Sequence, residues 1–309
     1  FKNKWWYLSG LLALLLVLPN IIWQVENDFP LWRHLQELSE SQLNEMGPFD
    51  YGIEQLSFPF TLILSVFGVF LLFLSQPFRS LGIAAVLIFM TMWVLQAKPY
   101  YVFAVYPILF AAGAVQVEKL LHQKRTVLKY VVVLLLLMGA IPFIPDLTPI
   151  LPIEAFVDYA KIEPNDKGRF ELTGDYADMF GWEEQVKLVD SLYHSLPELE
   201  QKNCALWAEN YGEAGALKIL GKKYGLPNPI SRHGSFWTWG PGNVNATTWI
   251  SLGNEPTAVK HIFEETQLIK TIYHPYSIDE ENGIPVYLCR KPKQDINAWW
   301  EAYEPYIFD

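Results

Sequence analysis

The sequence predicts a two-part protein: a polytopic α-helical membrane domain over residues 1–149, followed by a small α/β domain over residues 150–309. Three observations lead to this fold class. Five apolar stretches fill the first part, whereas short strand-like and helix-like segments alternate in the second. The charges divide at the same place: nine basic and nine acidic residues lie in 1–149, so the whole net charge of −10 lies in 150–309.

Each apolar stretch approaches the roughly 20 residues that a helix needs to cross a membrane. Runs such as LLALLLVL and VVVLLLLM have no polar face, which a helix on the surface of a soluble protein would need. The first stretch lacks the cleavage site of a signal peptide, so we expect it to remain as a span. The predicted spans are Trp5 to Trp23, Phe58 to Leu74, Leu81 to Leu95, Tyr100 to Val115, and Tyr130 to Ile144.

Basic residues in the connecting loops predict the orientation, because such residues concentrate on the cytoplasmic side. One side holds only Arg33 and Lys98 in its membrane-proximal loops, so this side is expected to face outward. The loop 24–57 and the domain 150–309 then lie outside the cytoplasm. The residues expected to face the cytoplasm are Lys2, Lys4, Arg79, Lys119, Lys124, Arg125 and Lys129.

Arg33 and Lys98 are the candidates for chemistry in the membrane half. A cation at the membrane interface suits a lipid phosphate, which arginine can bind through two parallel hydrogen bonds. Tyr100 and Tyr101 can donate hydroxyl groups at the same depth. Simpler explanations stay open, because Arg33 can pair with Glu37 one helical turn on and Lys98 can extend to the headgroups.

His34 follows Arg33 and can bind a divalent metal, donate to a phosphate, or do neither. The sequence contains no GxSxG, HExxH or paired-cysteine metal motif, which leaves hydrolase and metalloprotease functions unsupported. Cys204 and Cys289 fit no zinc or redox spacing; they are either two buried thiols or a disulfide. The acidic second half does not suggest nucleic acid as a partner.

Two runs in the membrane half, LPNIIWQVENDFPLWRHL and KPYYVFAVYPILFAAGAVQVE, resemble the C-terminal half of glycosyltransferase family 39 proteins. These are polytopic GT-C transferases related to protein O-mannosyltransferases and to the lipid A aminoarabinose transferase. The most specific part is KPYY at residues 98–101, followed by YP at 106–107 and the small-residue stretch AAGA. AENYGEAGALKILGKKYGLP and HGSFWTWGPG are similar to the outer domain of bacterial members, so the resemblance covers most of the chain.

The resemblance implies that a sugar moves from a polyprenyl-phosphate carrier to a glycan, lipid or protein acceptor at the outer face of the bacterial inner membrane. It implies that cations such as Arg33 and Lys98 hold the carrier phosphate. The family's acidic general base lies in the first outer loop of the full protein, and this chain offers no counterpart, so no catalytic residue is assigned. Because the chain starts at Phe1, we expect it to be the C-terminal part of a longer polypeptide. The alternative is a non-catalytic membrane-anchored binding or assembly subunit.

In the second half, strands and helices are expected to alternate in an α/β sandwich, and ligands of such sheets favour loops after strands. The loop after the first strand is 209–213, in which Asn210 and Glu213 can cap the next helix; alternatively the loop, with Tyr211 and Glu213, contacts an acceptor or sugar. A second loop, 232–242, contains His233, Trp237 and Trp239, which either contact sugar or pack the domain onto the membrane half. Strands are expected at 204–208, 247–252, 267–273 and 285–290, and helices at 180–196, 213–224, 256–265 and 296–303.

Overall fold

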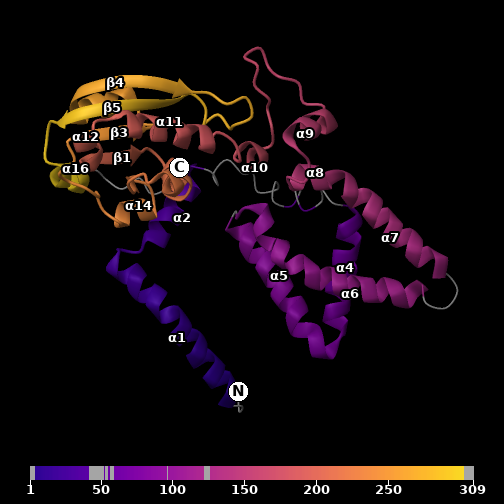
Figure 1. Cartoon of the computed structure of the whole chain (residues 1–309). Helices are drawn as coiled ribbons and strands as arrows, with labels where there is room; N and C mark the ends of the chain where they lie inside the picture. Colours follow the sequence, from indigo (N-terminus) through magenta and orange to yellow (C-terminus); the bar gives the residue numbers. More distant parts are fainter. Residues whose placement is uncertain are drawn as a thin grey trace. The chain divides into compact units, whose positions relative to one another are not determined.

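The computed structural model describes residues 4–41, 52, 55, 59–95, 97–121 and 126–302. The chain divides into two compact units, Phe1–Ile144 and Pro145–Asp309, which we call the helical unit and the sheet unit. Figure 1 shows the helices of the first unit and the strands of the second along the chain.

The helical unit contains apolar helices of the length that membrane spans require. Four segments are long and apolar enough to cross a membrane: Tyr7–Glu26, Gln76–Val94, Pro99–Lys119 and Val127–Leu147. The predicted span at 58–74 corresponds to α4, whose apolar part, Leu64–Leu74, is a shorter helix. The described elements are α1 (Lys4–Glu26), α2 (Pro30–Ser41), α4 (Pro59–Leu74), η2 (Gln76–Phe78), α5 (Arg79–Val94), η3 (Pro99–Val105), α6 (Tyr106–Leu121), α7 (Thr126–Ala140), η4 (Ile141–Phe143) and α8 (Ile144–Leu147), the last of which continues into the sheet unit.

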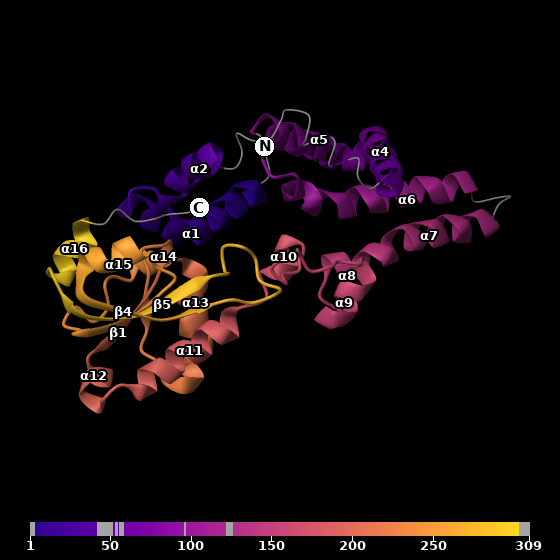
Figure 2. The ribbon, with the colours of Figure 1, turned by 90° about the horizontal axis from the view of Figure 1, so that it is seen from above.

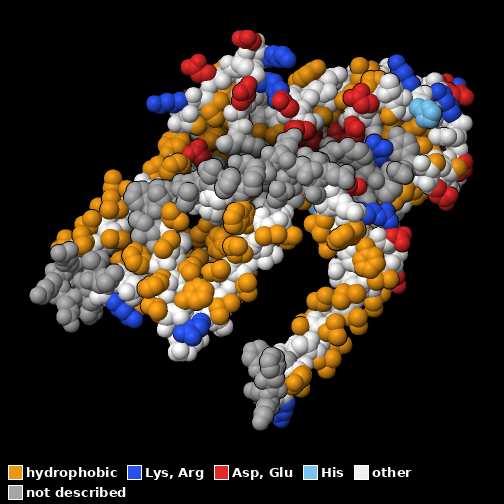
Figure 3. Space-filling view, turned by 180° about the vertical axis from the view of Figure 1, so that it is seen from behind, with side chains coloured by type: hydrophobic (Ala, Val, Ile, Leu, Met, Phe, Trp, Pro, Cys, Tyr) orange, Lys and Arg blue, Asp and Glu red, His pale blue; other side chains and the backbone are white. Residues whose placement is uncertain are grey.

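The surface of these helices is apolar. Leu16 on α1 and Met138 on α7 are 74% and 63% exposed, and many of their neighbours are exposed to a similar extent. Figure 3 shows hydrophobic side chains along the helices with few charges between them. Apolar patches of this extent mark surfaces that contact lipid or another protein.

Two glycines allow α4 and α6 to approach until their backbones touch. A Cβ atom added at Gly68 of α4 would lie 2.1 Å from the carbonyl oxygen of Leu109. A Cβ added at Gly113 of α6 would lie 2.0 Å from the carbonyl oxygen of Leu64. Membrane helices commonly pack through small residues in this way. Gly113 belongs to the AAGA stretch, so this stretch has a packing role.

The sheet unit contains a five-stranded mixed sheet in the order β2-β1-β3-β5-β4. β1 is parallel to both β2 and β3, and β5 is antiparallel to both β3 and β4. The strands are β1 (Cys204–Ala208), β2 (Pro229–Ile230), β3 (Thr248–Leu252), β4 (Phe263–Ile272) and β5 (Ile284–Pro292). The helices are α9 (Ile153–Ala160), α10 (Gly174–Ala177), α11 (Trp182–Ser195), α12 (Glu198–Lys202), α13 (Tyr211–Leu220), η5 (Gly221–Tyr224), α14 (Ser235–Thr238), α15 (Pro256–Ile262) and α16 (Ile296–Ala302).

Both faces of the sheet are covered, so the strands carry apolar residues on each side. Leu206 and Ile250 pack with α11 and α13 on one face. Trp207 and Trp249 pack with α15 and α16 on the other face, and both tryptophans are almost fully buried. Figure 2 shows α11 and α15 on opposite sides of the strands. This arrangement is a small α/β domain, as the alternation of strands and helices predicted.

Three local predictions needed correction. The helix predicted at 256–265 ends at Ile262, and Phe263 begins β4, where pairing with β5 outweighs the helical preference of the glutamates that follow. The helix predicted at 213–224 begins at Tyr211 and gives way to η5 at Gly221. Strand β2, which has only two residues, was not predicted.

The two cysteines are separate buried thiols. Cys204 in β1 belongs to the core on the α11 face, whereas Cys289 in β5 belongs to the core on the α15 face. Burial raises the pKa of each thiol to about 12. The disulfide alternative is therefore wrong for this fold, because the sheet itself lies between the two side chains.

Candidate functional site

The segment at 98–101 begins the helical stretch of η3 and α6. Lys98 has the extended ψ of 133° that a following proline favours, and Pro99 occupies the first turn of η3. The backbone N–H of Tyr101 donates to the carbonyl oxygen of Lys98 at 3.1 Å. The rings of Tyr100 and Tyr101 meet edge to face, and each side chain is about half exposed. The polar ends of this segment are therefore available to a ligand.

A partly buried chain of hydrogen bonds connects this segment to Gln55 and Tyr106 in the helical unit. The Gln55 side-chain amide donates to the carbonyl oxygen of Pro99 at 3.1 Å. The Tyr106 hydroxyl donates to Oε1 of the same glutamine. The Tyr106 ring is fixed from three sides by Phe89, Phe103 and Phe110. Gln55 thus links the residue after Lys98 to the first residue of α6.

Next to this chain lies a cavity of about 660 Å³, which we call the α4–α6 cavity. Its described lining is almost wholly apolar and comes from α4, α5 and α6, with polar groups only from Gln55, Ser65 and Tyr106. Its size is typical of small-molecule sites. The apolar part of the lining comprises Gly52, Leu62, Val66, Val69, Phe70, Phe73, Phe89, Met90, Trp93 and Leu109.

An apolar cavity with a polar end suits an amphiphile. Hydrocarbon in the cavity would be removed from water along its length, which contributes about 0.8 kcal/mol for each buried CH₂ group. A charged head group beside the polar end could pair with Lys98, one residue before Pro99. The arrangement can therefore bind a long-chain lipid phosphate, although none of the described residues that line the cavity is an acid or a histidine.

Arg33 and His34 lie on α2, apart in sequence from this segment. Arg33 forms an ion pair with Asp28 at 3.6 Å, in which both side chains are substantially exposed. An exposed pair of this kind stabilises little, so Arg33 can exchange it for a phosphate. His34 is partly buried. Within the described ranges, no group of three or more histidine, cysteine or acidic residues is placed to hold a metal ion.

In the sheet unit, Glu213 completes a capping box at the start of α13. The Asn210 side chain accepts a hydrogen bond from the backbone N–H of Glu213 at 2.9 Å. The Glu213 carboxylate in turn accepts from the backbone N–H of Glu209 at 2.9 Å and of Asn210 at 3.4 Å. An added Cβ at Gly253 would meet the Glu213 carboxylate at 2.0 Å, so glycine is required there. The capping role proposed for this loop is therefore present.

A second carboxylate, which sequence reasoning missed, lies near this box. Glu281 accepts hydrogen bonds from the Asn210 amide at 3.0 Å and from the Gln185 amide at 2.9 Å. Burial raises the pKa of Glu213 well above its ordinary value, and the charge of Glu281 raises it further. Burial also raises the pKa of Glu281. Nothing in the sequence signals this pair, because Glu281 comes from the hairpin between β4 and β5.

The two loops singled out in the sequence meet at the carboxyl edge of the parallel strands. The ring of Tyr211, which follows β1, contacts the buried ring of His233, which follows β2, at 4.7 Å. Trp237 stacks on Trp300 inside the sheet unit, so its role is internal packing. Trp239 is 59% exposed, and Lys218 lies over its ring at 3.5 Å. Of these aromatic residues, Tyr211 and Trp239 are the exposed ones.

Comparison of the chain with protein family models, curated proteins and solved structures gave no match.

Proposed function

We propose that this chain is part of a membrane glycosyltransferase that takes a sugar from a polyprenyl-phosphate carrier. The observation that carries the proposal is the α4–α6 cavity with its polar end at Gln55, which contacts the residue after Lys98. A polyprenyl phosphate has the two parts that this arrangement suits, a long hydrocarbon and an anionic head. We propose sugar transfer as the reaction because the segment 98–101 resembles glycosyltransferase family 39.

The proposed placement is the inner membrane of a bacterium, with the sheet unit outside the cytoplasm. Four helices of spanning length support a multi-pass protein, and the shorter α4 is proposed as the fifth span. The distribution of basic residues between the loops supports the orientation. The acceptor is proposed to be a glycan, a lipid or a protein of the cell envelope.

In this proposal each residue of the segment has a separate role. Lys98 pairs with the carrier phosphate, and the exposed hydroxyls of Tyr100 and Tyr101 donate hydrogen bonds to it. Arg33 breaks its ion pair with Asp28 and binds the same phosphate. The hydrocarbon lies in the α4–α6 cavity, where Val69 and Phe89 line its path.

A second candidate, a non-catalytic subunit that binds the carrier for a partner, is favoured by one observation. None of the described residues that line the α4–α6 cavity carries a carboxylate that could act as general base. Binding of the carrier is common to both candidates. Turnover of a carrier-linked sugar by the polypeptide that carries this chain distinguishes them, because a binding subunit transfers no sugar.

The test is binding of a polyprenyl phosphate to the full chain in nanodiscs, measured by native mass spectrometry. Loss of one charge-assisted hydrogen bond, worth about 1.5–3 kcal/mol, should weaken binding in Lys98→Ala by roughly tenfold or more. Val69→Trp should weaken binding by filling the cavity. Val133→Trp, on the exposed surface of α7, is the matched control and should bind as the unchanged chain does.

Arg33 is tested separately because its ion pair offers a competing explanation. If Arg33 binds phosphate, Arg33→Lys should weaken binding, since lysine lacks the planar two-pronged donor, and Asp28→Asn should not. If the arginine only pairs with Asp28, both variants should bind normally. Unchanged binding in both Lys98→Ala and Val69→Trp would overturn the proposed carrier site.

A further inference from the structure

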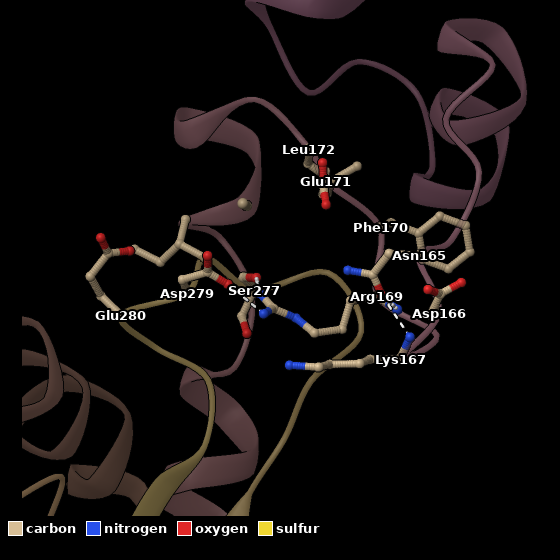
Figure 4. Close-up of a pocket in the computed structure, with 12 residues that line it drawn as sticks. Asn165, Asp166, Lys167, Arg169, Phe170, Glu171, Leu172, Ser277, Asp279 and Glu280 are labelled. Atoms are coloured by element: carbon tan, nitrogen blue, oxygen red, sulfur yellow. Dashed lines mark hydrogen bonds and ion pairs between the residues drawn. The ribbon is translucent and has the colours of Figure 1, made fainter.

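A second cavity lies wholly within the sheet unit and has a different chemical character. It has a volume of about 910 Å³ and lies between the segment 165–172 and the hairpin tip 277–280 (Figure 4). We call it the hairpin pocket. Unlike the α4–α6 cavity, it is lined mainly by polar and charged side chains, and nothing in the proposed function uses it.

The first wall of the hairpin pocket is a tight turn held by its own hydrogen bonds. The Asn165 side chain accepts from the backbone N–H of Lys167 at 3.0 Å and of Arg169 at 3.1 Å. Gly168 adopts a φ of +74°, which glycine tolerates without strain. An isolated β-bridge joins Pro164 and Phe170 at the base of the turn. The turn therefore holds its side chains in a fixed position.

The second wall is the tip of the β4–β5 hairpin, and it is also closed by hydrogen bonds. The Asn282 side chain donates to the carbonyl oxygen of His274 at 3.0 Å and accepts from the His274 N–H at 3.2 Å. The two walls are joined by Arg169, whose Nη2 donates to the carbonyl oxygen of Ser277 at 3.1 Å and whose Nη1 pairs with Asp279. Both walls are therefore pre-formed, which lowers the entropy lost on binding.

Arg169 places a positive charge in the lining of the hairpin pocket. Its guanidinium is held by Ser277 and Asp279, and the side chain remains 27% exposed. Figure 4 shows Lys167 and Arg169 extending in the same direction, toward the hairpin tip. The arginine thus presents a fixed and partly exposed charge to the pocket.

The remaining charges decide which ligand suits the pocket. Asp166, Glu171, Asp279 and Glu280 line it, against Lys167 and Arg169, so carboxylates are in excess and repel anions. Burial raises the pKa of Asp178, and the charges of Asp175 and Glu280 raise it further. No metal-binding group of three or more histidine, cysteine or acidic side chains occurs in the part of the chain that the structure describes.

The geometry points to a saccharide, neutral or amino-substituted, as the ligand of the hairpin pocket. A sugar hydroxyl both donates and accepts, so it can use the carboxylates and the two cations at once, whereas a lysine side chain only donates and is repelled by Lys167 and Arg169. The Phe170 ring lies beside the polar groups and packs on Tyr276, and it supplies an apolar surface for a sugar ring. This inference does not depend on the proposed function, because it concerns binding by another unit.

The test is calorimetric titration of the full chain in nanodiscs at mildly acidic pH. The probes are a glucosamine trisaccharide, an N-acetylglucosamine trisaccharide, a galacturonic acid trisaccharide and trilysine. The glucosamine and N-acetylglucosamine trisaccharides should bind in the millimolar range or more tightly, and the glucosamine trisaccharide should bind more strongly of the two. The galacturonic acid trisaccharide should not bind. Saccharides that fail to bind, or trilysine binding more tightly than both of them, would overturn the inference.

Variants locate the binding in the pocket. Arg169→Lys keeps the charge but loses the planar guanidinium, and should weaken binding of both saccharides by roughly tenfold, the effect of one lost charge-assisted hydrogen bond. Glu171→Gln should weaken binding of the glucosamine trisaccharide more than binding of the N-acetylglucosamine trisaccharide, since only the former carries ammonium groups. Glu264→Gln, exposed on β4 and outside the pocket, should leave both unchanged. Equal binding by all three variants would place the saccharide elsewhere and overturn the assignment.

Discussion

The helical unit and the sheet unit place large and small side chains in opposite positions. In the helical unit, leucines such as Leu16 face outward, whereas Gly68 and Gly113 occupy the contact between α4 and α6. In the sheet unit, Trp207 and Trp249 are buried and the charged residues lie mostly outside. Membrane helices have this pattern, because burial of leucine gains little when the surroundings are already apolar.

The two units also differ in where they place their polar side chains. The sheet unit buries Glu213 and Glu281 and supports them with the amides of Asn210 and Gln185. The helical unit has its described polar chain at one end of a cavity, from Tyr106 through Gln55 to a backbone carbonyl. In both units these side chains are hydrogen-bonded to a partner, because an unpaired buried polar group is expensive in either setting.

The largest expected effect is in the helical unit. Gly113→Leu should abolish the close contact of α4 and α6, because its Cβ alone would lie 2.0 Å from a backbone oxygen. Overpacking of this kind costs about 1–3 kcal/mol or more. Thermal unfolding in micelles, followed by circular dichroism, should show a clearly lower midpoint. Gly10→Leu on α1 is the control, since a Cβ there meets nothing within 4 Å. Equal midpoints for the two variants would contradict the close-contact account.

The second prediction concerns the pH dependence of the sheet unit. Because the folded-state pKa of Glu213 is raised above its ordinary value of 4.5, the folded state holds a proton that the unfolded state releases. The stabilisation that Glu213 contributes is therefore greatest below pH 4.5 and declines as the pH rises toward the folded-state pKa of this carboxyl. Each pKa unit of difference between the folded and unfolded states corresponds to about 1.4 kcal/mol in the free energy of unfolding.

Urea unfolding at a series of pH values measures this effect. Glu213→Gln keeps an acceptor for the capping hydrogen bonds but cannot ionise, so the decline in stability with rising pH should become shallower. Glu154→Gln, exposed on α9, should keep the slope of the unchanged chain. A steep decline that survives in Glu213→Gln would assign the pH dependence to Glu281 or other groups.

The smallest expected effect compares two ion pairs of the sheet unit. Arg290 donates from both Nε and Nη2 to Glu200, at 3.1 and 2.8 Å, and this pair is partly buried. A double-mutant cycle should give a coupling of about 1 kcal/mol for this pair. The exposed pair of Lys187 and Glu183 on α11 should give a smaller coupling, because solvent screens the attraction between the two charges. A larger coupling for the exposed pair would contradict the role assigned to burial.

The elements that were predicted correctly have patterns contained in a short segment. Strand β1 reads as a continuous apolar run, and β3 is rich in β-branched and aromatic residues. The cap formed by Asn210 and Glu213 follows from their three-residue spacing. The end of α15 was misplaced because pairing of β4 with β5 decided it. The hairpin pocket was not predicted, since Arg169 meets Asp279 across 110 positions of sequence.

The sequence by itself determined where apolar segments lie, where the strands β1, β3 and β5 and the helix α11 form, and how one helix is capped. Hydrophobic periodicity and capping act over a few residues, so they can be recognised without a fold. The tertiary structure decided that Gly68 of α4 lies against α6 and that Gly113 of α6 lies against α4. It also decided that Cys204 and Cys289 lie on opposite faces of the sheet. It also decided that Glu281 approaches Asn210. These contacts join distant segments, and only the packing of whole elements brings such segments together.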